Sequence, residues 1–170
     1  GEETGREGHK MRRRSTAHGA AENVRTLLKS LGFTLENTDL HINFPGGMPV
    51  DGPSAGVAMA VAAVSALTDT PVDGTMAVTG EITVQGKVKA VGSVPQKVEA
   101  ACQAGLLRVL IPKENDAETL HIACIEVQGI DDVHQALSAM LVSTKTAKKL
   151  IPSPLPMTEK VAAAAAEPSA

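Results

Sequence analysis

The run of small apolar residues from Pro53 to Thr68 is the feature that most constrains this fold. Alanine and valine would occupy every side of a helix formed by this run, which is typical of a helix that is buried over most of its surface. The chain has 170 residues, and its only aromatic side chains are Phe33 and Phe44. This length is enough for one sizeable core, which we expect to consist of valine, isoleucine, leucine, alanine and methionine.

Helix and strand patterns alternate along the rest of the chain. Apolar residues at helical spacing predict a helix from Thr16 to Leu31, which Gly32 ends. The alternation in "DLHINF" predicts a half-exposed strand. Later segments predict, in order, a hairpin turning at Gln85-Gly86, a helix in "PQKVEAACQAG", a strand in "LLRVLIP", a short helix from "KENDAETLH", a strand in "IACIEVQ" and a helix in "DDVHQALSAMLV". This order favours an α/β fold or α+β layers.

The two ends of the chain differ in composition from the centre. Residues 1–15 are glycine-rich and contain the basic cluster "HKMRRRS", which predicts a mobile basic segment, a solvated arm more readily than a phosphate-binding patch. Residues 144–170 are of low complexity and contain several prolines, which predicts a flexible C-terminal tail. One domain is therefore expected between them, over residues 16–143.

Charge and hydropathy exclude several classes of function. The formal net charge is −3, so no overall basic field favours nucleic acid. The sequence contains no signal peptide, and its most apolar stretch is too short to span a bilayer, so we expect no membrane contact. Bacterial cytoplasm is the expected location, ahead of an organelle matrix. Cys102 and Cys124 stand singly in apolar stretches, which favours buried free thiols over a disulfide or a metal site.

Ser54 has two interpretations. In the first, Asp51 caps a helix, Pro53 occupies its first turn, and the serine is only tolerated there. In the second, the serine lies among the unpaired N–H groups at the positive end of the helix dipole, and these could stabilise an oxyanion on an attacked carbonyl. A serine nucleophile needs a base. No histidine comes with an orienting aspartate, and Lys97, beside apolar neighbours, is otherwise an ordinary surface lysine.

Several motifs resemble the Lon protease proteolytic domain. "PVDGPSAG", "TGEITVQGKVKAVGSVPQK" and "AGLLRVLIPKEN" occur in the family's order, and the similarity covers about residues 11–142. The resemblance implies mixed sheets packed with helices, and a dyad with Ser54 as nucleophile and Lys97 as base. It further implies that Thr79 hydrogen-bonds near the lysine and that Asp51 influences assembly of the dyad. The oxyanion would then be held by the backbone of Pro53, Ser54 and Ala55.

The resemblance also gives "HINFPGG" a role. In such proteases the substrate backbone pairs with an exposed strand beside the serine, which here implies His41, Ile42, Asn43 and Phe44. Pairing of this kind reads backbone rather than sequence, and it suits unfolded polypeptide substrates. The alternative is that these residues form an ordinary strand of the sheet.

The sequence departs from the family pattern at several places. Val50 stands where the commonest form has lysine, which favours a B-type or Lon-like relative, and Ser93 replaces a frequent glycine. The chain is expected to begin after the family's first strands. It contains no phosphate-binding G-x-x-x-x-G-K-[ST] motif. ATP and Mg²⁺ are therefore expected only through an ATPase module outside this chain, unless the protein is an ATP-independent relative.

Two functions follow from the resemblance. The first is a serine endopeptidase that degrades unfolded or damaged proteins and assembles as a homo-oligomeric ring, normally a hexamer. The second is a non-catalytic Lon-like scaffold of a ring-forming DNA-repair ATPase. Such scaffolds lack the serine–lysine pair, whereas Ser54 and Lys97 are both present here, and the charge of −3 disfavours DNA.

Overall fold

The computed structural model describes residues 16–44 and 52–142. The segments expected to be a mobile arm and a tail, together with Val50 and Asp51, lie outside these residues. The described elements are, in chain order, α1 (Thr16–Ser30), the 3₁₀ helix η1 (Pro53–Ala55), α2 (Gly56–Thr68), β1 (Met76–Val78), β2 (Glu81–Ile82), β3 (Val88–Lys89), α3 (Val94–Gln103), β4 (Arg108–Pro112), the 3₁₀ helix η2 (Lys113–Glu118), β5 (Glu126–Ile130) and α4 (Val133–Met140). The expected mixture of helices and strands is confirmed.

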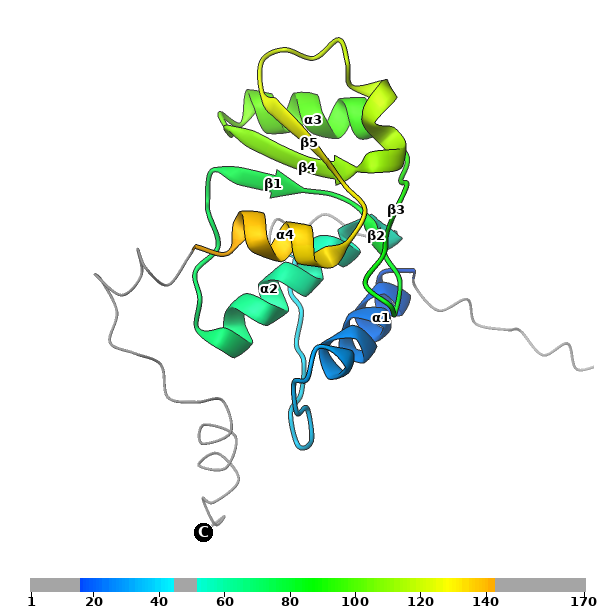
Figure 1. Ribbon diagram of the computed structural model, residues 1–170, viewed down its shortest axis with the longest axis vertical. Helices are drawn as coiled ribbons and strands as arrows, with labels where there is room; N and C mark the ends of the chain where they lie inside the picture. Colours follow the sequence, from blue (N-terminus) through cyan, green and yellow to red (C-terminus); the bar gives the residue numbers. More distant parts are fainter. Residues whose placement is uncertain (1–15, 45–51, 143–170) are drawn as a thin grey trace, which may run out of the picture.

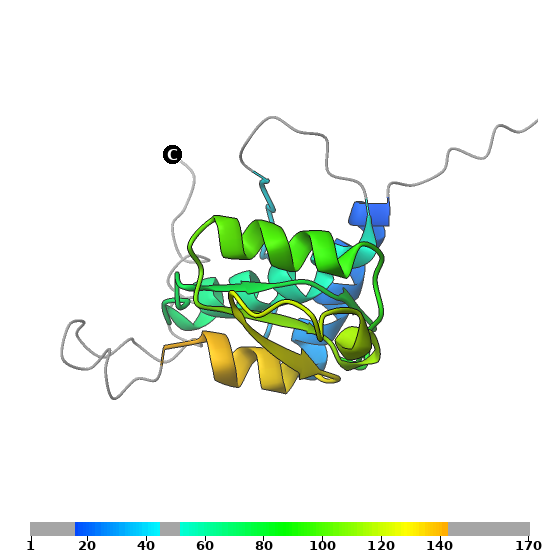
Figure 2. The ribbon, with the colours of Figure 1, turned by 90° about the horizontal axis from the view of Figure 1, so that it is seen from above.

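A parallel sheet in the order β1-β4-β5 lies below α3 and above α4 and α2 in Figure 1. Helix α3 lies on one face of this sheet and α4 on the other (Figure 2). Strand β4 is central, and the side chains of Val109 and Ile111 contribute to the cluster under α3, whereas Leu110 contributes to the cluster shared with α1, α2 and α4. Burial on both faces explains why "RVLIP" is an almost continuous apolar run.

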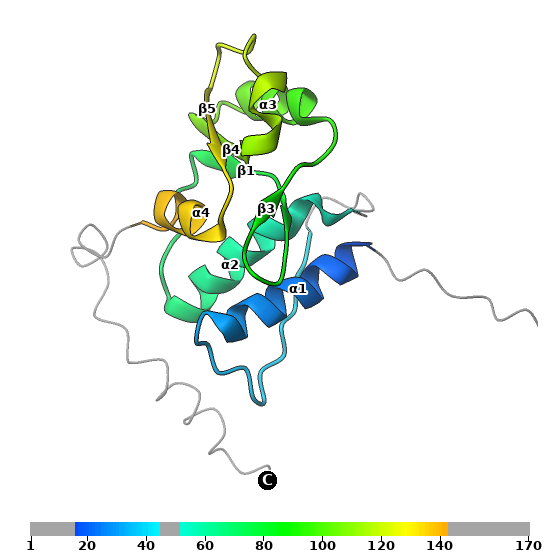
Figure 3. The same cartoon turned by 45° about the vertical axis from the view of Figure 1, so that its right-hand side comes forward.

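The helix expected over Pro53–Thr68 is present as η1 followed by α2. Helix α2 lies between α1 and α4 in both Figure 1 and Figure 3, and it contacts each of them. Val57, Ala60 and Val61 of α2 are almost fully buried. The small side chains of this helix allow neighbours to pack closely on several sides, as the sequence predicted.

The predicted hairpin is also present. Strands β2 and β3 pair antiparallel, and Gly86 in the connecting turn has a φ of +83°. The side-chain amide of Asn23 in α1 donates to the Ile82 carbonyl oxygen at 3.1 Å. The hairpin is therefore fastened to α1, beside which it lies in Figure 3.

The structure corrects two expectations. Residues 40–44 form no ladder with any described strand, so the strand predicted from "DLHINF" is wrong. Only one apolar side chain of the alternating set, Ile42, packs against the core, while Leu40 and Phe44 are 39% and 37% exposed. A segment with so little apolar burial gains little from joining a sheet.

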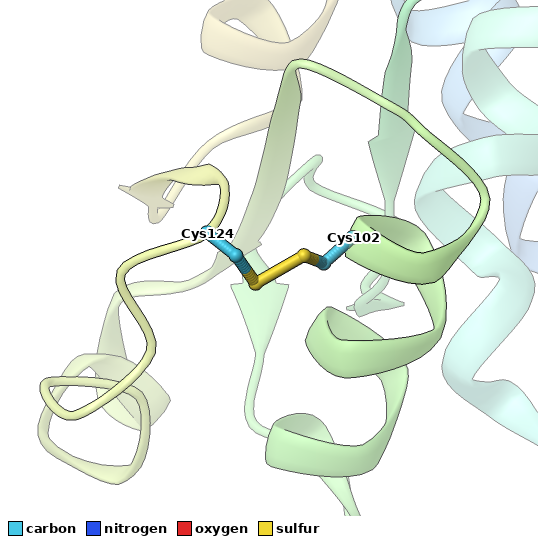
Figure 4. The surroundings of a disulfide bond; sticks show 2 residues. All are labelled: Cys102 and Cys124. Atoms are coloured by element: carbon cyan, nitrogen blue, oxygen red, sulfur yellow. A yellow bond between two sulfur atoms is a disulfide. The ribbon is translucent and has the colours of Figure 1, made fainter.

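The second correction concerns the cysteines. Cys102 and Cys124 form a disulfide with 6.1 Å between their Cα atoms (Figure 4). The bond joins α3 to the loop before β5, and the Cys124 side chain is exposed rather than buried. The expectation of free, buried thiols is therefore wrong, and the cysteines no longer argue for a reducing compartment.

Candidate active site

Ser54 lies in η1, at the turn that leads into α2, and is half-buried. Its carbonyl oxygen accepts hydrogen bonds from the Gly80 N–H at 2.9 Å and from the Thr79 hydroxyl at 3.3 Å. The Gly80 carbonyl in turn accepts a bond from the Val57 N–H at 3.2 Å. These bonds fix the turn that carries Ser54 to the segment after β1.

Thr79 connects Ser54 with Lys97. The threonine is 8% exposed, and its Oγ1 lies 3.4 Å from the Lys97 Nζ. The Thr79 hydroxyl can donate to the Ser54 carbonyl while its oxygen accepts from the lysine amine, because a hydroxyl is both donor and acceptor. The Thr79 N–H donates to the Leu110 carbonyl at 3.0 Å, so the central strand β4 holds this bridge in place.

Lys97 is in the first half of α3. Val94 and Val98 of the same helix are fully buried in the cluster between α3 and the sheet, and Lys97 is half-buried beside them. Burial lowers the pKa of the Lys97 amine below its ordinary value, because loss of water disfavours the charged form. Lys97 takes part in no ion pair with another described residue. The amine is thus partly desolvated and hydrogen-bonded to a hydroxyl.

A match to a known family shows to which family the chain belongs. The family model described as the Lon protease (S16) C-terminal proteolytic domain matches residues 2–144. The chain belongs to this family.

Relatives of the Lon family agree with that assignment. The chain is 44% identical over 149 residues to Lon protease 2 of Bacillus subtilis (strain 168), which covers 87% of the chain and 27% of the relative. It is 39% identical over 141 residues to the archaeal Lon protease of Archaeoglobus fulgidus, with coverage of 79% and 23%. It is 55% identical over 84 residues to the Lon protease of Clostridioides difficile (strain 630), or 49% of the chain and 11% of the relative. The chain thus spans about a quarter or less of the length of these relatives.

Within this Lon domain, Ser54 and Lys97 do not hydrogen-bond directly; Thr79 connects them in the part of the chain that is described. Of the three residues expected to hold an oxyanion, Pro53 cannot donate because proline has no N–H. The N–H groups of Ser54 and Ala55 remain as candidate donors. Asp51, expected to influence assembly of the dyad, lies outside the described residues.

The expected substrate strand of the Lon domain is an exposed, unpaired segment. His41 and Asn43 are exposed, Ile42 is half-buried against the core, and Phe44 is exposed at the last described position before Gly52. No group of three or more His, Cys, Asp or Glu side chains could hold a metal ion among residues 16–44 and 52–142. Within the same residues, no helix is both long and apolar enough to cross a membrane.

One buried polar residue near the start of α3 was not predicted from the sequence. Asn115 in η2 is 4% exposed and hydrogen-bonds the backbone before α3. The asparagine was visible in the motif "IPKEN", three residues after the end of an apolar strand. Nothing in the spacing of the sequence, however, indicated that its partner would be 24 residues away.

Proposed function

We propose that this Lon domain acts as a serine endopeptidase, with Ser54 as the nucleophile and Lys97 as the general base. The observation that carries the proposal is the hydrogen-bonded connection of the Ser54 carbonyl through Thr79 to the Lys97 amine. A serine at a helix start and a desolvated amine are the two groups that this chemistry requires. The lowered pKa of Lys97 supports the same assignment.

The reaction would begin with the neutral form of Lys97. Its Nζ takes the proton from the Ser54 hydroxyl as the Ser54 oxygen attacks the peptide carbonyl carbon. The carbonyl oxygen becomes an oxyanion, which the N–H groups of Ser54 and Ala55 stabilise. The Lys97 ammonium then gives the proton to the leaving amine, and an acyl-enzyme remains. Water, deprotonated by the same amine, releases the acyl group.

Thr79 would orient the base. The Thr79 hydroxyl hydrogen is directed to the Ser54 carbonyl, so the Thr79 oxygen presents a lone pair to the lysine. One N–H of the neutral amine is then used by Thr79, and the amine lone pair is left for the serine hydroxyl. Thr79 thus holds both partners without taking a proton itself.

Membership of the family supports a proposal for the substrates and the assembly. Unfolded polypeptides would pair with the backbone of residues 41–44, which no described strand occupies. Lon protease 2 of Bacillus subtilis is much longer than this chain, which covers 27% of it. In this proposal an ATPase module elsewhere in the parent protein would bind ATP and Mg²⁺. A homo-oligomeric ring, normally a hexamer, would enclose the sites.

The test is cleavage of an unfolded protein by the wild type and by Ser54→Ala, together with labelling by a peptide boronate. We expect cleavage and labelling in the wild type and neither in the variant. The variant should keep its fold, since no hydrogen bond of the Ser54 hydroxyl to another described residue is lost. Equal cleavage by both proteins would overturn the assignment. Absence of both signals with tight DNA binding would favour the scaffold function instead.

A further inference from the structure

The Asn115 side chain hydrogen-bonds to the loop that leads into α3, the helix that contains Lys97. We call this pair of hydrogen bonds between Asn115 and Val91 the clasp. The Asn115 Oδ1 accepts a hydrogen bond from the Val91 N–H at 3.1 Å, and its Nδ2 donates to the Val91 carbonyl at 3.2 Å. The second Nδ2 hydrogen goes to Glu118 Oε1. Both amide hydrogens are therefore used, and the side chain pairs with Val91 as a neighbouring strand would. At 4% exposure, water does not compete for these bonds.

Besides this clasp, the loop is held by the Val91 side chain, which packs against the apolar cluster under α3. Val91 lies three residues before the first residue of α3, and its neighbour Gly92 is exposed. Ser93, at the N-cap of α3, has a left-handed backbone with a φ of +58° and makes no side-chain capping hydrogen bond. The start of α3 therefore depends on contacts from outside the helix.

Strand β4 is the common frame for both sides of the candidate site. Its Leu110 carbonyl accepts the Thr79 N–H, and η2 with Asn115 follows directly from the end of β4. One connection thus runs from β4 to Thr79 and Ser54. The other runs from β4 through Asn115 and Val91 to α3 and Lys97. The positions of Ser54 and of Lys97 therefore both depend on β4.

We infer that Asn115 is a positioning residue that sets α3 so that the Lys97 Nζ meets the Thr79 Oγ1. The inference rests on the proposed serine–lysine function. The Nζ to Oγ1 distance is 3.4 Å, close to the upper limit for a hydrogen bond, so a small outward shift of α3 would break the contact. Misplacement of a reacting group by about 1 Å can cost on the order of 100-fold in rate.

The experiment compares Asn115→Leu with a matched control, Thr119→Val. Thr119 is also buried in this region, at 5% exposure, but its hydroxyl binds only the Asp116 carbonyl three residues away. Both variants lose buried hydrogen bonds, and only Asn115→Leu releases the loop before α3. Peptide hydrolysis (kcat, KM and the pH profile) and thermal unfolding are measured for each, at a temperature where both remain folded.

We expect Asn115→Leu to lower kcat about 10- to 100-fold while KM changes little, because substrate binding does not use Lys97. The ionisation seen in its pH profile should move to higher pH, since a displaced amine regains water. Thr119→Val should lower the unfolding temperature and leave kcat and the pH profile unchanged. A loss of kcat by both variants in proportion to stability, or an unchanged kcat in Asn115→Leu, would overturn the inference.

A second variant and a second readout keep the two proposals separate. Asn115→Asp retains an acceptor for the Val91 N–H and loses both donors, so an effect in the same direction is expected if Asn115→Leu does not fold. The Lys97 pKa is also followed by NMR of the side-chain amine, which does not require turnover. A wild type without peptidase activity would contradict the proposed function, whereas a Lys97 pKa that is the same in the wild type and in both Asn115 variants would contradict the clasp.

Discussion

Gly56 and Ile82 are in such close contact that a Cβ atom on the glycine would lie 2.8 Å from the Ile82 Cγ2 and 3.0 Å from its backbone nitrogen. Helix α2 therefore approaches β2 at a distance that only glycine permits. Gly56 is two residues after Ser54, so this contact also determines where the serine lies. Close packing against Ile82 thus explains why the last residue of "DGPSAG" is glycine.

Gly56→Ala should destabilise the protein by about 1–3 kcal/mol, the usual cost of overpacking a core. The Ile82 backbone cannot give way easily, since Asn23 holds its carbonyl. Unfolding in denaturant measures the free energy of unfolding, and labelling by a peptide boronate shows whether Ser54 still reacts. The control is Gly19→Ala in α1, where a Cβ meets nothing within 4 Å and should stabilise the helix by roughly 0.5–1 kcal/mol. Equal stability of the two variants would contradict the contact.

Lys97→Arg should be as inactive as Lys97→Ala, although it keeps the positive charge. A guanidinium stays protonated up to a pKa above about 12 and cannot accept the proton of Ser54. Hydrolysis of a peptide substrate is the measurement. Turnover near that of the wild type in Lys97→Arg would exclude lysine as the base.

The wild-type rate should rise with pH through one ionisation below the ordinary lysine pKa of about 10.4. Desolvation lowers the Lys97 pKa, so the neutral amine becomes populated at a lower pH than in a free lysine. The lowered Lys97 pKa also makes the stability of the protein depend on pH. The folded protein disfavours the charged form of Lys97, and this lowers the free energy of unfolding at a pH below the folded pKa. The loss disappears as the pH rises from the folded pKa of Lys97 to its higher pKa in the unfolded chain. A pH–rate profile that is flat across this range would contradict the assignment.

Thr79→Val should lower kcat because the valine has nearly the same shape but no hydroxyl for Lys97 and the Ser54 carbonyl. Stability should fall by about 1–3 kcal/mol, because a buried hydrogen bond is lost. Thr79→Ser retains the hydroxyl and should keep most of the activity. Steady-state kinetics of the two variants distinguish the bridge from simple packing, because Thr79→Val removes only the hydroxyl and Thr79→Ser removes only the methyl group. Identical kinetics in the two variants would remove the proposed role of Thr79.

Reduction of the Cys102–Cys124 bond should lower the free energy of unfolding by about 3 kcal/mol, as the chain-entropy model gives for a loop of this size. The sequence separation is 22 residues. Denaturant unfolding with and without reductant measures the loss, and Cys102→Ser combined with Cys124→Ser should be insensitive to reductant. Two free thiols found by peptide mapping of the unreduced protein would contradict the bond.

The sequence by itself determined most of the elements. The apolar period predicted α1, the small-residue run predicted η1 and α2, and "LLRVLIP" predicted β4, because each pattern matches the burial of one local element. The motifs also identified the family, and with it Ser54, Lys97 and Thr79 as candidate site residues. These are properties of short segments, which a linear pattern records directly.

Tertiary structure alone decided the relations between segments. Residues 40–44 alternate in polarity, yet only Ile42 meets the core, so the pattern did not produce a strand. Cys102 and Cys124 become partners because α3 and the loop before β5 lie side by side (Figure 4). Asn115 reaches Val91 because η2 follows the central strand. Each of these contacts depends on how separate elements pack, and packing is set by the whole core rather than by local spacing.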